Sequence, residues 1–345
     1  MTSIGLVGTG KWGINWARAL HRLAEVDFRW CCDLSESRLD WVRQQFPGVR
    51  TTTDIQQIFD DQKVQGLVIA TSAPTHYKLA MKALDHGRHV MVEKPLTLTS
   101  EDAGNLVKHA REKNSIVMVG HLLEYHPAIR YIKSLLDSGQ LGDIHYIYSQ
   151  RLNLGTVRKD ENAWWSLAPH DISVACRLLG QAPESVCCQG QAVVQPDVAD
   201  VVFASLKFPD NRICHIHVSW LDPHKTRKLT VVGSNGMVTF DDTKPTYQVS
   251  VFDKRVSINN SFETYADWVS MHQGDIVFPQ IKSAEPLLEE AKHFVECIRT
   301  GSTPISDGIS GLQVVSVLEK GDESLRLNGV RVDIPKWSGP TRLAA

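Results

Sequence analysis

The stretch SIGLVGTGKWGINWARAL, residues 3–20, decides the fold of the first part of the chain. It begins with an apolar run typical of a buried strand, turns through glycines, and continues with apolar residues at helical spacing. Gly8, Gly10 and Gly13 form the G-x-G-x-x-G pattern that joins a strand to a helix in dinucleotide-binding folds. Gly8 permits the tight turn, Gly10 lets a pyrophosphate approach the backbone, and Gly13 lets the helix pack on the strand.

A second strand pattern ends at Asp33, which follows Gly13 by 20 residues. This spacing is typical of a carboxylate that binds the adenosine ribose. Because a carboxylate accepts hydrogen bonds from ribose hydroxyls and repels a 2′-phosphate, Asp33 favours NAD over NADP. Arg38 is close enough in sequence to weaken that preference, so NADP stays open. The other cofactor contacts that we expect are Thr9, Lys11, Trp12, Thr71, Ser72, Pro74, His76, Glu93 and Lys94.

Strand and helix patterns alternate up to about residue 123, which predicts a Rossmann domain with a doubly wound parallel sheet over residues 1–123. In such sheets ligands bind beyond the carboxyl ends of the strands. From about residue 143, alternating runs joined by turns indicate hairpins. Residues 124–345 are therefore predicted to form an α+β domain with a large, open, mostly antiparallel sheet. The helices expected beside this sheet are 127–138, 169–179, 284–299 and 308–326.

Composition excludes several classes of protein. The net charge of −2 gives no electrostatic reason to expect nucleic acid or an anionic membrane as a partner. No apolar run is as long as a membrane-spanning helix, and a strand pattern at the amino terminus leaves no room for a signal peptide. The seven cysteines lack zinc-binding spacing, so we expect reduced thiols, a cytoplasmic location and no metal.

Four motifs taken together resemble the glucose–fructose oxidoreductase, inositol dehydrogenase and MocA family of NAD(P)-dependent sugar dehydrogenases. They are the glycine loop, IATSAPTHY (69–77), VEKP (92–95) and VGHLLEYHP (119–127). The resemblance extends through the carboxyl-terminal segment that begins EPLLEE at residue 285. It implies a second domain whose open sheet joins subunits, and hence a homodimer or homotetramer. His215 and His217 share one face of a strand there, where packing or interface roles are favoured over metal binding.

Lys94 and His170 are the predicted catalytic residues. Lys94 offers a positive donor that can hold a substrate hydroxyl and favour its developing alkoxide. Pro169 suits the first turn of a helix, so we expect His170 in that turn, where positive potential favours a neutral imidazole. The resemblance implies that His170 removes the hydroxyl proton while hydride passes to the nicotinamide.

The chain departs from the family at Ser166, four residues before His170, where many members carry an aspartate. Serine can donate a hydrogen bond but cannot stabilise an imidazolium as a carboxylate does. Asp171 or an acid group of the substrate could supply the missing charge.

The stretch RLNLGTVRKDENAWWSLAPHD, residues 151–171, resembles the subgroup of UDP-N-acetylglucosamine 3-dehydrogenases. The resemblance predicts oxidation of a secondary sugar hydroxyl, at C3 of a UDP-linked N-acetylhexosamine. Trp164 and Trp165 could stack on a sugar or nicotinamide face, or pack in an interface. The alternatives are a dehydrogenase of a free sugar, sugar phosphate or inositol, and an inactive cofactor-binding regulator. The predicted substrate-binding residues are Lys94, Tyr125 (or His126), Arg151, Asn153, Arg158, Trp165, Ser166 and His170.

Overall fold

A computed structural model describes residues 1–258 and 269–337, which divide into two compact units. The first unit comprises residues 1–125 and 284–316, and the second comprises residues 126–258, 269–283 and 317–337. This division differs from the expected one because residues 284–316 return to the first unit. Ser306 and Asp307 lie beside strand β6 there, with the backbone N–H of Val119 donating to the carbonyl of Ser306 at 2.8 Å.

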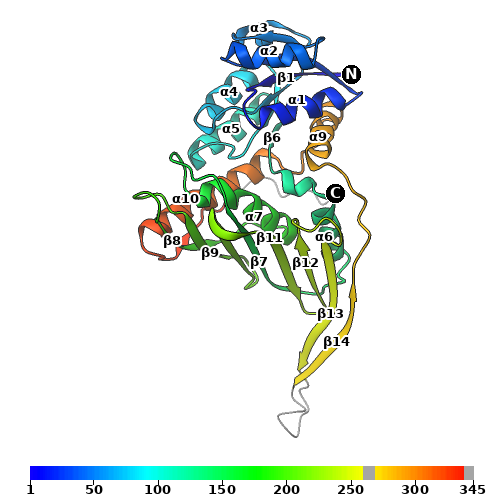
Figure 1. Cartoon of the computed structure of the whole chain (residues 1–345), viewed down its shortest axis with the longest axis vertical. Coiled ribbons are helices and arrows are strands. Elements are labelled where there is room, and N and C mark those ends of the chain that lie inside the picture. The colour runs from blue at the N-terminus through cyan, green and yellow to red at the C-terminus, as the bar shows by residue number, and fades with distance from the viewer. Residues whose placement is uncertain (259–268, 338–345) are drawn as a thin grey trace. The chain divides into compact units, whose positions relative to one another are not determined.

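The first unit, which bears the labels β1, β6 and α1 to α5 in Figure 1, contains a parallel sheet. This sheet has six strands in the order β3-β2-β1-β4-β5-β6. This confirms the predicted Rossmann domain, whose strand order reverses between β1 and β4. Its strands are β1 (Thr2–Val7), β2 (Val26–Cys32), β3 (Arg50–Thr52), β4 (Gly66–Ile69), β5 (His89–Val92) and β6 (Val117–Val119). Its helices are α1 (Gly13–Arg22), α2 (Glu36–Gln45), α3 (Gln56–Asp60), α4 (Ala73–Asp85), α5 (Ser100–Glu112), the 3₁₀ turn η1 (Leu122–Tyr125), α9 (Pro286–Thr300) and the first half of α10 (Gly308–Arg326).

The core of the first unit is a continuous apolar cluster that includes β1, α1 and α9. Strand β1 is buried along its whole length, as expected for a central strand of a parallel sheet. Helix α9 packs on α1 and β1, and Phe294 is completely buried. Gly66 allows this close approach, because a Cβ atom there would lie 2.8 Å from the side chain of Ile298.

The second unit contains a nine-stranded sheet in the order β14-β13-β12-β11-β7-β10-β9-β8-β15. Among the described strands of this second sheet, only the β7–β10 pair is parallel, which confirms the predicted mostly antiparallel sheet. The strands are β7 (Ile144–Leu154), β8 (Ser185–Gln191), β9 (Val201–Lys207), β10 (Ile213–Ser219), β11 (Leu221–Gly233), β12 (Met237–Asp241), β13 (Val249–Ile258), β14 (Val269–Val277) and β15 (Val332–Asp333). Helices α6 (Pro127–Asp137) and α7 (Ala163–Leu179) pack on strands of this sheet.

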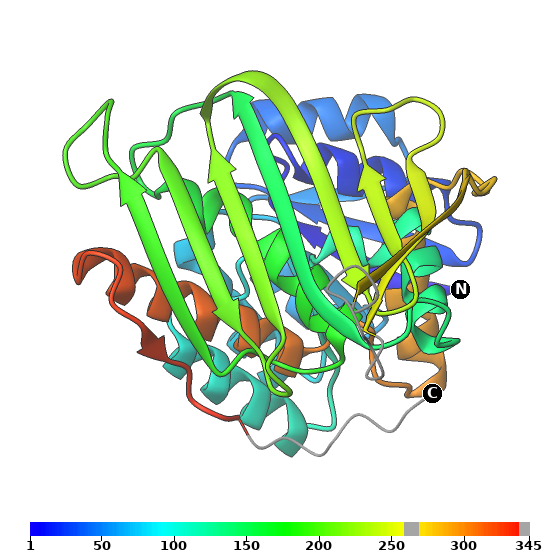
Figure 2. The same cartoon turned by 90° about the horizontal axis from the view of Figure 1, so that it is seen from below.

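The two faces of the second sheet differ in what covers them. On β10, Cys214, Ile216 and Val218 are buried on the face that contacts α7. The alternate residues point to the opposite face, which Figure 2 shows from the front and on which no described helix of this unit lies. The exposed apolar and aromatic side chains on that face are Tyr146, Tyr148, Phe203 and Ile213.

In the part of the chain that the structure describes, no helix combines the length and apolar character needed to cross a bilayer. All seven cysteines are free thiols.

Candidate active site

The glycine loop has the geometry that a bound dinucleotide requires. Gly8 has a φ of +93°, a conformation that residues with a Cβ rarely adopt. A Cβ atom on Gly13 would lie 2.0 Å from the carbonyl oxygen of Gly8, so only glycine lets α1 start this close to β1. At Gly10 the nearest side-chain atom to a Cβ would be Nη1 of Arg38 at 3.9 Å, which leaves the backbone open to a ligand. These residues fit a pyrophosphate at the amino end of α1.

Asp33 is bound to the same loop at the end of β2. One carboxylate oxygen accepts hydrogen bonds from the Thr9 backbone N–H at 2.7 Å and the Thr9 hydroxyl at 2.8 Å. The other accepts from the backbone N–H of Ser35 at 2.9 Å. Arg38 Nη1 lies 3.6 Å from the oxygen that Thr9 binds. Burial opposes ionisation, but these hydrogen bonds outweigh it and lower the pKa of Asp33. The carboxylate is therefore ionised and fixed where a ribose is expected.

The loop after β4 is tied to the loop after β5 through His76. This side chain is buried, and its Nδ1 lies 2.8 Å from the carbonyl oxygen of Pro95 and its Nε2 3.2 Å from that of Thr71. Burial lowers the pKa of His76, which favours the neutral ring. Ser72 is the N-cap residue of α4, and Pro74 lies in its first turn. Because a neutral ring has one N–H, it donates to one of these two carbonyls. The shorter contact, to Pro95, joins the start of α4 to the loop after β5.

Glu93 of the EKP motif is held by two tryptophans. Its Oε1 accepts a hydrogen bond from the indole N–H of Trp16 at 2.7 Å and another from that of Trp12. Gly120 makes room for the carboxyl group, because a Cβ there would lie 2.8 Å from Glu93 Oε2. Glu93 therefore joins the end of β5 to the glycine loop, which positions the neighbouring half-buried Lys94. Lys94 and Pro95 are linked by a cis peptide bond.

A cluster of buried acids, not predicted from the sequence, lies beneath this motif. Glu124 of η1 and Glu290 of α9 are both buried, and His121 Nδ1 lies 3.4 Å from Glu124 Oε1. Neither carboxyl oxygen of Glu290 has a hydrogen-bond partner among the described residues. Burial, with the nearby carboxyl groups of Glu93 and Glu124, raises the pKa of Glu290 well above its usual value. Burial therefore favours the protonated, neutral form of Glu290 in the folded protein.

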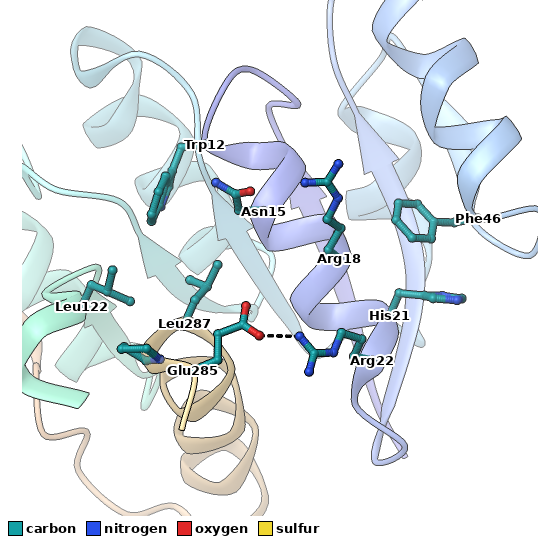
Figure 3. Close-up of a pocket in the computed structure, with 10 residues that line it drawn as sticks. Trp12, Asn15, Arg18, His21, Arg22, Phe46, Leu122, Glu285 and Leu287 are labelled. Carbon is teal, nitrogen blue, oxygen red and sulfur yellow. Dashed lines mark hydrogen bonds and ion pairs between the residues drawn. The ribbon is translucent and has the colours of Figure 1, made fainter. Parts of the chain in front are cut away.

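Beside the glycine loop, a groove with a volume of about 470 Å³ runs along the outer side of α1 (Figure 3). Trp12 lines one end of the groove, and Arg22 forms an ion pair with Glu285 across it. Because the indole of Trp12 both lines the groove and donates to Glu93, the groove adjoins the EKP motif. The groove also includes Asn15, Arg18, His21, Phe46, Leu122, Pro286 and Leu287.

In the second unit, the position of His170 corrects one sequence prediction. Helix α7 begins at Ala163, not at Pro169, because the Asn162 side chain caps it by accepting from the Trp165 backbone N–H at 3.0 Å. His170 is thus inside the helix, beyond its first turn. The expected effect of the helix amino terminus on its imidazole is therefore wrong, since that potential decays within the first turn.

Both tryptophans before His170 are anchored to α10. Trp164 is fully buried, and its indole N–H donates to the carbonyl of Leu318 at 3.1 Å. The indole N–H of Trp165 donates to Asp322, which also accepts from the Asn162 side chain at 2.9 Å. These contacts favour packing over sugar stacking for Trp164.

The remaining predicted substrate residues have varied surroundings. Arg151 pairs with Asp171, its Nε lying 2.7 Å from Oδ2, so Asp171 neutralises a guanidinium. Arg158 pairs with Glu161 at 3.0 Å in the loop before α7. Tyr125 is fully buried with its hydroxyl 2.9 Å from Ser306 Oγ, which favours packing over the expected substrate contact.

Three further predicted residues lie in the second unit. His126 caps α6, accepting from the backbone N–H of Ala128 at 3.1 Å. Asn153 is half-buried near the end of β7, and Ser166 is buried in α7. Among the residues that the structure describes, no group of three or more His, Cys, Asp or Glu side chains is arranged to hold a metal ion. The assignments to substrate stay predictions.

Two parts of the chain match known protein families. Residues 2–121 match the family described as "Oxidoreductase family, NAD-binding Rossmann fold". Residues 129–239 match the GFO/IDH/MocA C-terminal domain. The chain belongs to the GFO/IDH/MocA oxidoreductase family. The first unit of this family member is therefore an NAD-binding Rossmann domain, as the sequence predicted.

Individual relatives of this family member are distant. It is 24% identical to scyllo-inositol 2-dehydrogenase (NAD(+)) of Bacillus subtilis, over 88% of this chain and 87% of the relative. It is 24% identical to UDP-N-acetylglucosamine 3-dehydrogenase of Acidithiobacillus ferrooxidans, over 74% of this chain and 76% of the relative. The crystal structure of GenD2 from gentamicin A biosynthesis, in complex with NAD, matches with a TM-score of 0.81 at 24% identity, covering 97% of each chain. This structural likeness shows a shared fold.

Proposed function

We propose that this GFO/IDH/MocA family member oxidises a secondary hydroxyl at C3 of a UDP-linked N-acetylhexosamine. The observation that carries the proposal is the combination of a dinucleotide loop, the EKP lysine and a histidine within WWSLAPHD, residues 164–171. The nucleotide-sugar substrate rests on the resemblance of residues 151–171 and on the relative from Acidithiobacillus ferrooxidans.

The chemistry divides among a few side chains. When bound, NAD supplies the acceptor for the hydride of the alcohol carbon. The Gly8–Gly13 loop and Asp33 hold its pyrophosphate and ribose. Lys94 donates a hydrogen bond to the substrate hydroxyl and stabilises the negative charge that develops on its oxygen. His170 accepts the hydroxyl proton.

The experiment mixes the protein with NAD and UDP-N-acetylglucosamine in a stopped-flow instrument and follows the absorbance of the reduced cofactor. We expect a rise in absorbance with this substrate and a much smaller one with N-acetylglucosamine alone. Tight NAD binding without turnover on any sugar or polyol would contradict the proposal and favour a cofactor-binding regulator.

The second candidate is a dehydrogenase of unlinked polyols. It is favoured by the Bacillus subtilis relative, whose similarity extends over 88% of this chain. A parallel panel of scyllo-inositol, myo-inositol, glucose and glucose 6-phosphate separates the candidates. Faster turnover of any of these than of the UDP-linked sugar would select the second one.

We also propose that the exposed face of the second sheet joins subunits into a homodimer or homotetramer. Tyr146 and Tyr148 stack at 6.4 Å, and Phe203 stacks on His217 at 4.2 Å, which makes an exposed aromatic surface. Such surfaces mark protein interfaces. Sedimentation analysis should give an oligomer for the natural chain and a smaller species for Tyr148→Glu. A natural chain that sediments as a monomer would contradict this proposal.

A further inference from the structure

The helix that carries His170 runs continuously through Ala163–Leu179 but lacks one backbone hydrogen bond just before that residue. Pro169 lies inside α7 and has no backbone N–H, so the hydrogen bond from residue 169 to the carbonyl of residue 165 cannot form. The turn that contains His170 therefore needs other contacts to fix its orientation. On the amino-terminal side these contacts are the indoles of Trp164 and Trp165, bound to α10.

On the carboxyl-terminal side the anchor is Asp171. Its carboxylate receives two hydrogen bonds from Arg151 of β7, from Nε at 2.7 Å and from Nη2 at 3.3 Å. Both side chains are largely buried, with 12% of Arg151 and 7% of Asp171 exposed. A two-pronged contact of this kind fixes direction as well as distance. Asp171 is therefore tied to the sheet in one orientation.

The geometry of a helix relates this anchor to His170. Adjacent residues project about 100° apart around the helix axis, so holding Asp171 on the sheet sets the direction of His170. A side-chain tip lies about 6 Å from the axis, and a rotation of about 10° moves it by about 1 Å. A displacement of that size at a reacting group can lower a rate about 100-fold.

We infer that the Arg151–Asp171 ion pair is a positioning device that fixes the rotation of α7 and thereby aims His170 at the reacting hydroxyl. The inference rests on the proposed function of His170 as the base. It gives Arg151 a role in orienting the catalytic turn, in place of the substrate contact expected from the sequence. Asp171 acts through the helix and not by neutralising the imidazolium.

The test compares Asp171→Asn, the double variant Arg151→Met/Asp171→Met, and the control Asp210→Asn. The first removes the carboxylate charge, and the second removes both charges, so that no buried charge is left without a partner. Asp210 forms an exposed ion pair with Arg212 at 2.8 Å in the β9–β10 turn of the same unit. It is therefore a matched control.

We expect both pair variants to fold and bind NAD, and to lose about 10- to 100-fold in kcat, with much smaller changes in KM. Arg151→Lys keeps the charge but not the two-pronged contact, and should therefore show a smaller loss of kcat than the two pair variants. The control should match the natural protein. A folded double variant with unchanged kcat would overturn the inference.

A second readout separates this inference from the proposed function. Histidine ring NMR signals, with that of His170 assigned through His170→Ala, report its surroundings without any turnover. We expect the His170 signal to shift or broaden in Asp171→Asn and to stay unchanged in Asp210→Asn. If the natural protein turns over no substrate, the proposed function fails, while the ring signal still tests the positioning. An unchanged His170 signal in Asp171→Asn would overturn the inference that the Arg151–Asp171 pair positions His170.

Discussion

The glycine loop of the first unit and the His170 turn of the second unit are built in different ways. The ribose end of the loop is set by a residue near it in sequence, because Thr9 binds Asp33, 24 residues away. The His170 turn depends on distant partners, since Trp165 and Asp322 are 157 residues apart. The difference teaches that the pyrophosphate and ribose positions of a nucleotide site follow from motif spacing at strand ends. The catalytic turn inside α7 takes part of its orientation from the distant helix α10.

The largest expected effect comes from the His170 turn itself. His170→Ala should lower kcat/KM about 10²- to 10⁴-fold, because a positioned general base is lost, and should leave NAD affinity unchanged. Steady-state kinetics and NAD titration check this outcome. His224→Ala, an exposed histidine of β11, is the control. A His170→Ala protein with normal turnover would contradict the assignment of His170 as the base. The turn would then not be the catalytic region that the comparison takes it to be.

Gly13→Ala tests the glycine loop, the first of the two regions compared. The added Cβ would lie 2.0 Å from the Gly8 carbonyl oxygen, so the loop must move. We expect the Kd for NAD to rise about 10- to 100-fold, in line with the 1–3 kcal/mol typical of overpacking. Gly48→Ala is the control, because a Cβ there has nothing within 4 Å. Calorimetric titration that shows equal NAD affinity for both variants would contradict the local account of this site.

Glu290, the buried acid near Glu93 of the EKP motif, predicts that the stability of the protein depends on pH. The pKa of Glu290 is raised in the folded protein, so the folded state keeps a proton that the unfolded state loses above about pH 4.5. Stability should therefore fall as pH rises from that value, by up to about 1.4 kcal/mol per pH unit, until Glu290 ionises. Glu290→Gln, which has no carboxyl group to ionise, should escape this loss.

Thermal unfolding at several pH values measures the effect. The melting temperature of Glu290→Gln should exceed that of the natural protein at pH 8 by a few degrees, and the two should converge near pH 4.5. Glu296→Gln, an exposed position of the same helix, should follow the natural protein at every pH. If the melting temperatures of Glu290→Gln and the natural protein differ by the same amount at every pH, the pKa of Glu290 is not raised by folding.

The smallest expected effect comes from restoring the family aspartate with Ser166→Asp. A carboxylate four residues before His170 lies on the same side of α7 and favours the protonated ring. The acid limb of the pH–rate profile should therefore move to higher pH, by about one unit. Ser166→Asn, which adds no charge, should leave that limb in place. Identical profiles for the two variants would show that residue 166 has no electrostatic influence on the base.

Much of the fold could be predicted because its patterns are local. Residues 3–20 contain a strand, a turn and a helix in order, and the hairpin between β11 and β12 follows from the turn at residues 233–236. The start of α7 was missed because Pro169 resembles a first-turn proline. Asn162 was the available signal, since asparagine is a favoured N-cap residue.

The sequence by itself determined the NAD-binding Rossmann half and the family, because these depend on short-range spacing around strand ends. Only the tertiary structure decided that Glu93 binds two indoles, that Glu290 is buried beside other acids, and that Arg151 holds Asp171. The physical reason is that charge pairing and burial depend on which distant segments pack together. No local pattern specifies such partners.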